Sequence, residues 1–201
     1  MDIFAGFTNF AWSVFQLVEK LWNPVLDAIM VFSTHLGEDG IFWIALGLIL
    51  CVFKKTRKYG VLLFLGLAFA TVINNLVLKQ IFERPRPFNF DGWPAEFIYP
   101  NLVEKPHSFS FPSGHTSTSL GSATPLLIKA NKKWGVPVFI IAVLVGFSRV
   151  YVHVHYPTDV IVGMIVGIVA GILAVVAFKF GMPLAKKILG EKLITKIFGE
   201  I

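Results

Sequence analysis

The chain has 201 residues, of which 55% are hydrophobic, and its charged fraction of 15% is well below the roughly 25% of soluble domains. Its mean hydropathy of +0.71 is typical of a membrane protein and excludes an ordinary soluble domain. The net charge of +6 would suit a nucleic-acid ligand in a soluble protein, but in an apolar chain the placement of the charges matters more than their sum. The length fits one compact bundle and no linker divides it, so we expect residues 1–201 to form a single membrane-embedded domain. The single cysteine excludes an intrachain disulfide.

Residues 1–22 carry apolar side chains at helical spacing with polar side chains opposite them. This pattern predicts an amphipathic helix that lies in the membrane interface. The stretch has neither a basic leader nor a small-residue cleavage site, so we do not expect it to be removed as a signal peptide. The apolar positions are Ile3, Phe4, Phe7, Phe10, Ala11, Val14, Phe15, Val18 and Leu21.

Six apolar stretches follow, and they predict an all-α fold: a six-transmembrane-helix bundle with an N-terminal interfacial amphipathic helix. Several stretches are shorter than the ~20 residues that a lone span needs, so we expect flanking residues to extend them or the bundle to shelter them. The stretches are 24–37, 40–53, 59–78, 114–128, 135–151 and 159–178.

Most basic residues lie near 54–58, near 130 and between Lys179 and the end of the tail 183–201. Together with Lys20 they make 13 of the 18 basic residues, and the positive-inside rule places this group in the cytoplasm. Both termini are then predicted to be cytoplasmic, with the tail as an amphipathic helix on anionic lipid of the plasma membrane. The remaining cations and all five histidines face outward, and these residues are Lys79, Arg84, Arg86, Lys105, Arg149, His35, His107, His115, His153 and His155.

The segment 79–112 is the one long connection, rich in proline and aromatic residues, and we expect a functional outer loop. Lys79 and Arg86 stand at its start, and two or three cations that converge on one point are what phosphoryl oxygens require. Arg84 competes with Arg86 for this role. Snorkelling toward lipid headgroups is the alternative explanation for such a cluster.

The stretch FPSGH follows this loop. Pro112 suits the first position of a helix, which leaves the amides of Ser113 and Gly114 unpaired at an end that binds anions. His115 lies within one turn of that end and is placed to move a proton. The small residues that follow allow close helix packing, and packing alone explains this stretch equally well when it is considered by itself.

The stretch SRVYVHVHYPTD carries the third group. Arg149 closes one apolar stretch and Pro157 marks the next helix start, with Asp159 in its first turn. A carboxylate on one ring nitrogen fixes the tautomer and leaves the other nitrogen free to attack, so His155 is the candidate nucleophile. His153 is interpreted as structural. A zinc or manganese site at His153, His155 and Asp159 is the competing interpretation, which three neighbouring cations disfavour.

Together the three stretches resemble the type 2 phosphatidic acid phosphatase superfamily, integral-membrane lipid phosphatases related to vanadium haloperoxidases. The family pattern is Lys, six residues, Arg-Pro; then Pro-Ser-Gly-His; then Ser-Arg, five residues, His, three residues, Asp. The spacing selects Arg86 over Arg84 and His155 over His153. The matching residues are Lys79, Arg86, Pro87, Pro112, Ser113, Gly114, His115, Ser148, Arg149, His155 and Asp159.

The resemblance implies a role for each residue. His155 attacks phosphorus to form a phosphohistidine, Asp159 orients it and His115 protonates the leaving oxygen. No metal and no cofactor is implied. The phosphate oxygens are then held by Lys79, Arg86, Ser113, Gly114 and Arg149.

The implied reaction removes a terminal phosphate from a lipid such as undecaprenyl diphosphate, phosphatidylglycerol phosphate or phosphatidic acid, at an outward-facing site. The partners are this lipid and the surrounding membrane, with no nucleic acid. The alternative is a non-catalytic protein that binds or transports anionic lipids.

Overall fold

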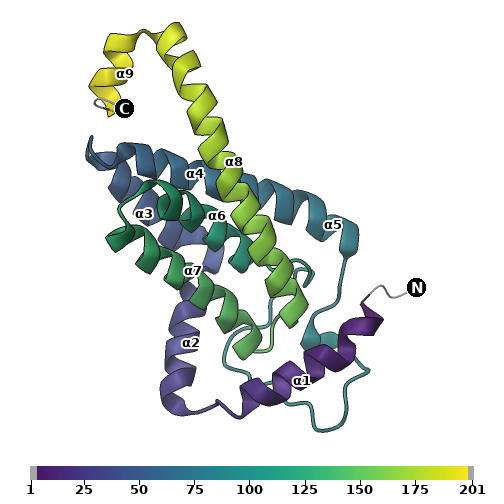
Figure 1. Ribbon diagram of the computed structural model, residues 1–201. Helices are drawn as coiled ribbons and strands as arrows, with labels where there is room; N and C mark the ends of the chain where they lie inside the picture. The colour runs from purple at the N-terminus through teal and green to yellow at the C-terminus, as the bar shows by residue number, and fades with distance from the viewer. Residues whose placement is uncertain (1–3, 199–201) are drawn as a thin grey trace.

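The computed structural model describes residues 4–198, and within that range every regular element is helical (Figure 1). This agrees with the predicted all-α class. Residues 1–3 of the predicted N-terminal helix and residues 199–201 of the predicted tail lie outside the described part. The elements are η1 Ala5–Phe7, α1 Thr8–Glu19, α2 Pro24–Leu36, η2 Glu38–Gly40, α3 Ile41–Val52, α4 Arg57–Thr71, η3 Val72–Leu78, α5 Lys79–Phe82, η4 Pro87–Asn89, α6 Gly114–Lys129, α7 Lys132–Tyr151, α8 Pro157–Leu189 and α9 Glu191–Phe198.

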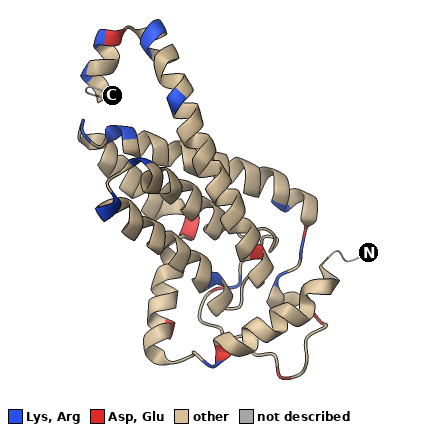
Figure 2. Ribbon diagram, in the orientation of Figure 1, with Lys and Arg blue, Asp and Glu red and all other residues tan. Residues whose placement is uncertain are grey.

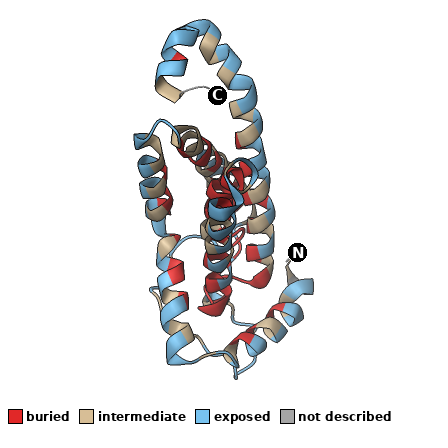
Figure 3. Ribbon diagram, turned by 60° about the vertical axis from the view of Figure 1, so that its left-hand side comes forward, coloured by how far each residue is buried: buried red, intermediate tan, exposed pale blue. Residues whose placement is uncertain are grey.

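Helix α6 forms the centre of the bundle and packs against α4, α7 and α8, and buried positions concentrate in this middle layer (Figure 3). Its small side chains let the neighbouring backbones approach closely. A methyl group on Gly66 of α4 would lie 2.0 Å from the carbonyl oxygen of Gly121, and one on Gly167 of α8 would lie 2.6 Å from that of Ser117. The predicted packing role of the hydroxyl-rich helix is therefore confirmed.

The prediction of six separate spans is not confirmed. In the described chain, three helical segments are long and apolar enough to cross a membrane, or up to four if the bent pair of α2 and α3 counts as one span. This pair bends by 52°, where Asp39 and Gly40 have positive φ values of 49° and 69°. In the sequence, the stretch GEDG resembles a turn between two spans. In the structure, it forms a kink between α2 and α3.

Hydrogen bonds place the start of α2 and the end of α3 near different ends of the bundle. Near the start of α2, Trp22 Nε1 donates to the carbonyl oxygen of Tyr151 at 3.3 Å, and the Tyr151 hydroxyl donates to Asp27 at 2.6 Å. Beyond the end of α3, Arg57 donates to the carbonyl oxygen of Ile197 in α9 at 2.6 Å. The helices that run along the bundle are α2 with α3, α4, α6, α7 and α8 (Figure 1).

Helix α1 lies across the end where α7 finishes, with Phe15 against His153, whereas α9 folds back at the opposite end, where most Lys and Arg residues gather (Figure 2). The expectation that both termini share one side is not confirmed by this arrangement, in which Lys20, at the C-terminal end of α1, lies apart from the basic residues around α9. The tail also differs, because α8 continues through Pro183 to Leu189 and α9 begins only after Gly190.

Candidate active site

The start of α6 differs in detail from its prediction. The helix begins at Gly114 with Ser113 as its N-cap residue, so Pro112 precedes the cap rather than opening the helix. The amide of Ser113 is not free, since it donates to the carbonyl oxygen of Asp159 at 3.0 Å and so joins the starts of α6 and α8. Ser113 is fully buried and does not line the cavity described below, whereas Gly114 and His115 do.

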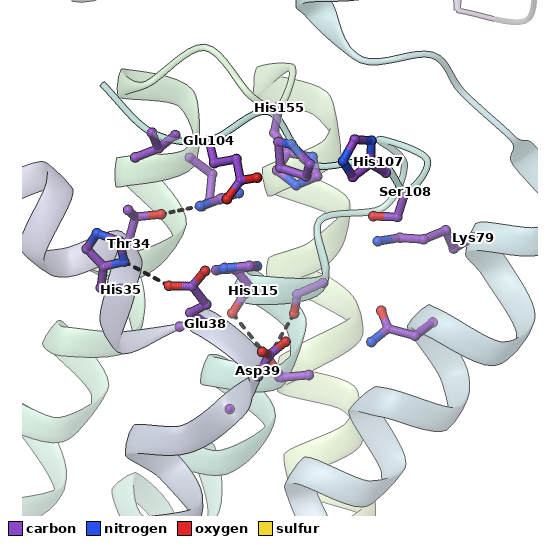
Figure 4. A pocket seen from close by; sticks show the side chains of 18 of the residues that line it. Thr34, His35, Glu38, Asp39, Lys79, Glu104, His107, Ser108, His115 and His155 are labelled. Carbon is purple, nitrogen blue, oxygen red and sulfur yellow. Dashed lines mark hydrogen bonds and ion pairs between the residues drawn. The ribbon is translucent and has the colours of Figure 1, made fainter. Parts of the chain in front are cut away.

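A cavity of about 750 Å³ lies among α2, η2, α4, α6, the turn between α7 and α8, and the long loop. It collects side chains from all three sequence stretches, which are far apart along the chain. Figure 4 shows Lys79, His115 and His155 facing this space from different elements. The predicted site residues that line it are Lys79, Arg86, Gly114, His115, Arg149 and His155.

The ring of His155 is buried, and its contacts fix the tautomer. Nε2 lies 3.3 Å from Arg86 Nη1, and because a guanidinium can only donate, Nε2 is the acceptor. The proton is then on Nδ1, which lies 3.4 Å from Asp159 Oδ2 and 3.4 Å from Ser110 Oγ. Burial, and then the charges of Arg86 and Arg149, hold the pKa of His155 well below its ordinary value. His155 is therefore a neutral imidazole with its unprotonated nitrogen beside the cavity cations.

Asp159 lies in the first turn of α8, as its spacing from Pro157 predicted. Its Oδ2 accepts the backbone N–H of Tyr156 at 3.0 Å and the hydroxyl of Ser110 at 2.5 Å. These bonds hold the carboxylate on the Nδ1 side of His155. The sequence interpretation missed Ser110, since a serine in a loop carries no periodic or spacing signal of its own.

The cavity cations are buried without carboxylate partners. Lys79 is 9% exposed, Arg86 4% and Arg149 4%, and none of them forms an ion pair with any described residue. Arg86 is held by the carbonyl oxygens of Ser108 at 2.6 Å and Val154 at 2.9 Å.

Arg149 donates through Nη1 to Thr34, and its buried Nε has no hydrogen-bond partner within residues 4–198. Uncompensated buried cations are costly, so three of them around one cavity indicate a site built for an anion.

His153 does not join this site. Its Nδ1 lies 3.0 Å from the carbonyl oxygen of Ile98, and its ring packs 4.3 Å from that of Phe15 and 5.6 Å from that of Phe97. Burial lowers the pKa of His153 to about 4, so it is a neutral core residue. The side chains of His153 and His155 therefore do not face a common site. Across residues 4–198, no three His, Cys, Asp or Glu side chains are grouped to hold a metal ion.

Comparisons with known proteins agree with the three-stretch pattern. A scan against protein-family models matches residues 58–182 to the PAP2 superfamily. An undecaprenyl-diphosphatase of Sulfolobus acidocaldarius is 35% identical over 177 residues, which cover 87% of this chain and 82% of that protein. The undecaprenyl-diphosphatase BcrC of Bacillus subtilis is 33% identical over 153 residues, or 75% of each chain.

Solved structures show the same likeness. Crystal structures of Aquifex aeolicus LpxE and of a PAP2-type phosphatidylglycerolphosphate phosphatase from Bacillus subtilis superpose with TM-scores of 0.69 and 0.67, at 30% and 31% identity. The first covers 82% of this chain and 93% of that chain, and the second covers 85% of each. With the family match over more than half of its length, the chain belongs to the PAP2 superfamily.

Proposed function

We propose that the protein is a membrane lipid phosphatase that hydrolyses a terminal phosphate from a lipid phosphate or diphosphate through a phosphohistidine intermediate. The observation that carries this proposal is the combination of three buried, unpaired cations with a neutral imidazole whose Nε2 faces them. Cations alone would only bind an anion. The other ring nitrogen of His155, Nδ1, is held by Asp159 and Ser110. This arrangement serves nucleophilic attack by Nε2 and has no use in a protein that only binds an anion.

In the proposed first step, the phosphoryl oxygens contact Lys79, Arg86, Arg149 and the free amide of Gly114 at the start of α6. His155 Nε2 forms a bond to phosphorus while the bond from phosphorus to the leaving oxygen breaks, and His115 gives its proton to that oxygen. Asp159 faces the imidazolium that results. Phosphoryl transfer depends mainly on positioning and on stabilising charge on the equatorial oxygens, and these cations provide both.

In the second step, His115 takes a proton from a water molecule as the water oxygen attacks the phosphohistidine. The bond between Nε2 and phosphorus breaks, inorganic phosphate leaves, and neutral His155 is restored. The three cations supply the positive charge that a divalent metal supplies in other phosphatases, so the scheme needs no metal. Ser113 has no part in the first contacts, because it does not line the cavity.

Undecaprenyl diphosphate is our preferred substrate, with phosphatidylglycerol phosphate and phosphatidic acid as the other candidates. Two relatives named as undecaprenyl-diphosphatases support this choice, one of them covering 87% of this chain. The cavity volume of about 750 Å³ also leaves ample room beyond one phosphoryl group.

Phosphate release from these three lipids by the purified protein in detergent tests the function. We expect turnover of undecaprenyl diphosphate to be the fastest, inhibition by vanadate, which mimics phosphate, and no loss of activity in a chelator. If the lipids bind but none yields phosphate, the protein is a binding or transport protein instead. Loss of activity in the chelator, with recovery on adding a divalent ion, would contradict the metal-free scheme.

We also propose that the site opens on the outer side of the plasma membrane and that α9 lies on the cytoplasmic side, with residues 1–201 forming one domain. The basic residues that gather at the α9 end support this orientation (Figure 2). Helix α1 then lies at the outer interface, where its exposed Phe10 and Leu17 contact lipid.

Cysteine labelling in intact cells tests the orientation. In a Cys51→Ser background, we expect Ala95→Cys, on the exposed part of the long loop, to react with an impermeant thiol reagent. We expect Lys55→Cys, exposed between α3 and α4, to react only after the cells are opened. The reverse pattern would invert the proposed orientation.

A further inference from the structure

Arg84 is a buried arginine that the scheme above does not use. It is 4% exposed, and it does not line the cavity that holds Arg86. Its Nη1 donates to Asp159 Oδ1 at 2.6 Å and to Thr158 Oγ1 at 2.8 Å. Its guanidinium carbon also lies 3.6 Å from the ring centroid of Tyr156 and 4.1 Å from that of Phe4. This arginine is therefore fixed behind Asp159, on the side away from the cavity.

The local sequence explains why two arginines so close together face opposite ways. Each is followed by a proline, in the stretch Arg84-Pro85-Arg86-Pro87, and a residue before proline is restricted to extended backbone. Arg86 has φ −78° and ψ 159°, as expected. These angles are those of polyproline II, which has three residues per turn, so side chains two residues apart point about 120° away from each other. Arg84 thus meets the start of α8, while Arg86 meets His155.

The contacts of Asp159 show what Arg84 does. The Oδ1 atom bonds Arg84, while Oδ2 bonds Ser110 and the Tyr156 amide and faces His155. With both oxygens engaged the carboxylate cannot rotate. Within the described residues Arg84 is also the only arginine or lysine that forms an ion pair with Asp159, which is fully buried. A buried carboxylate that loses its cation is left uncompensated and takes up a proton or moves.

We propose that Arg84 is a positioning residue for the phosphatase reaction: it acts through Asp159, whose carboxylate it orients toward His155 Nδ1, and it does not touch the substrate. This inference rests on the proposed function. It separates the two arginines of one short stretch, with Arg86 binding the phosphoryl group and Arg84 supporting the carboxylate behind the nucleophile.

A double-mutant cycle tests the proposal, with Arg84→Gln, Asp159→Asn and the combined variant. We expect Arg84→Gln to lower kcat by about 10- to 100-fold, the range of coupling between contacting residues. The KM for the lipid and the inhibition constant for vanadate should stay within about twofold of the wild-type values, because the cavity cations are unchanged. In the Asp159→Asn background, the same change should cost less than about threefold, because the group through which it acts is already gone.

Further variants guard against a trivial loss of folding. Arg84→Lys keeps a cation near Asp159 and should recover part of the lost kcat. Millimolar guanidinium should partly restore the kcat of Arg84→Ala, since a second cavity of about 440 Å³ reaches this side chain. Thr158→Val removes the other hydrogen bond of Arg84 and should keep kcat within about threefold, if the Asp159 contact is what matters. Thermal unfolding in detergent is measured for each variant.

Two outcomes overturn the assignment. Fully additive losses in the cycle would show that Arg84 acts independently of Asp159, and a raised KM or weaker vanadate inhibition with unchanged kcat would show that it binds substrate. A wild-type protein that releases no phosphate would instead refute the proposed function, and Arg84 would then have no reaction to support.

Discussion

Replacing His155 with alanine should lower phosphate release from lipid substrates by more than about 10⁴-fold, the scale of loss when a covalent nucleophile is removed. His155 Nε2 accepts a hydrogen bond from the cavity cation Arg86, whereas His153 faces the aromatic core. The measurement is inorganic phosphate released by the purified variant in detergent, compared with the wild-type protein at equal concentration.

A second readout follows the intermediate directly. Wild-type protein mixed with labelled lipid phosphate and quenched in alkali should carry acid-labile label, and His155→Ala should carry none. The control is Glu96→Ala, which removes an exposed side chain of the outer loop that does not line the cavity and should keep activity within about threefold. If His155→Ala retains turnover while its unfolding temperature is unchanged, the nucleophile assignment is wrong.

Replacing His115 with alanine should have an effect that depends on the leaving group. A general acid typically contributes about 10²- to 10⁴-fold, and it contributes most when the departing oxygen is strongly basic. With phosphatidic acid the leaving group is an alcohol oxygen, so we expect a loss of about 10³-fold or more. With undecaprenyl diphosphate the leaving group is a phosphate, which departs readily, so we expect the loss to be at least tenfold smaller.

The ratio of the two losses is the informative quantity. It is obtained from kcat/KM for both lipids with the wild-type protein and His115→Ala, and a soluble aryl phosphate with a good leaving group serves as a third point. Equal losses for all three substrates would mean that His115 only shapes the cavity and does not protonate the leaving oxygen. Folding is compared through thermal unfolding in the same detergent.

Sequence spacing predicted the central features of the site because each stretch carries a local rule. Pro157 opens a helix and places Asp159 in its first turn, and the hydroxyl-rich run after His115 could pack only inside a bundle. The shared cavity of Lys79, Arg86, His115, Arg149 and His155 followed from the family pattern. No single stretch would have shown that they meet.

Other features depend on contacts between distant segments and carry no local signal. Ser110 and Arg84 acquire their roles only when the loop folds onto α8. The kink between α2 and α3 is marked by glycines that equally suit a turn, so the sequence alone predicted two separate spans at this bent pair. For Ser113, the missing information was that its amide already bonds Asp159 across to the next helix.

Helices α1 and α2 support the site, so the part of the chain that the site needs is longer than the part that matches the family model. The family match begins at residue 58, yet Thr34 of α2 bonds Arg149, and Phe15 of α1 packs on His153, in the same turn as the site residue His155. A chain trimmed to residues 58–182 would retain every motif and still lose these supports. Natural relatives are therefore expected to preserve the size and shape of their N-terminal quarter even where its residues diverge.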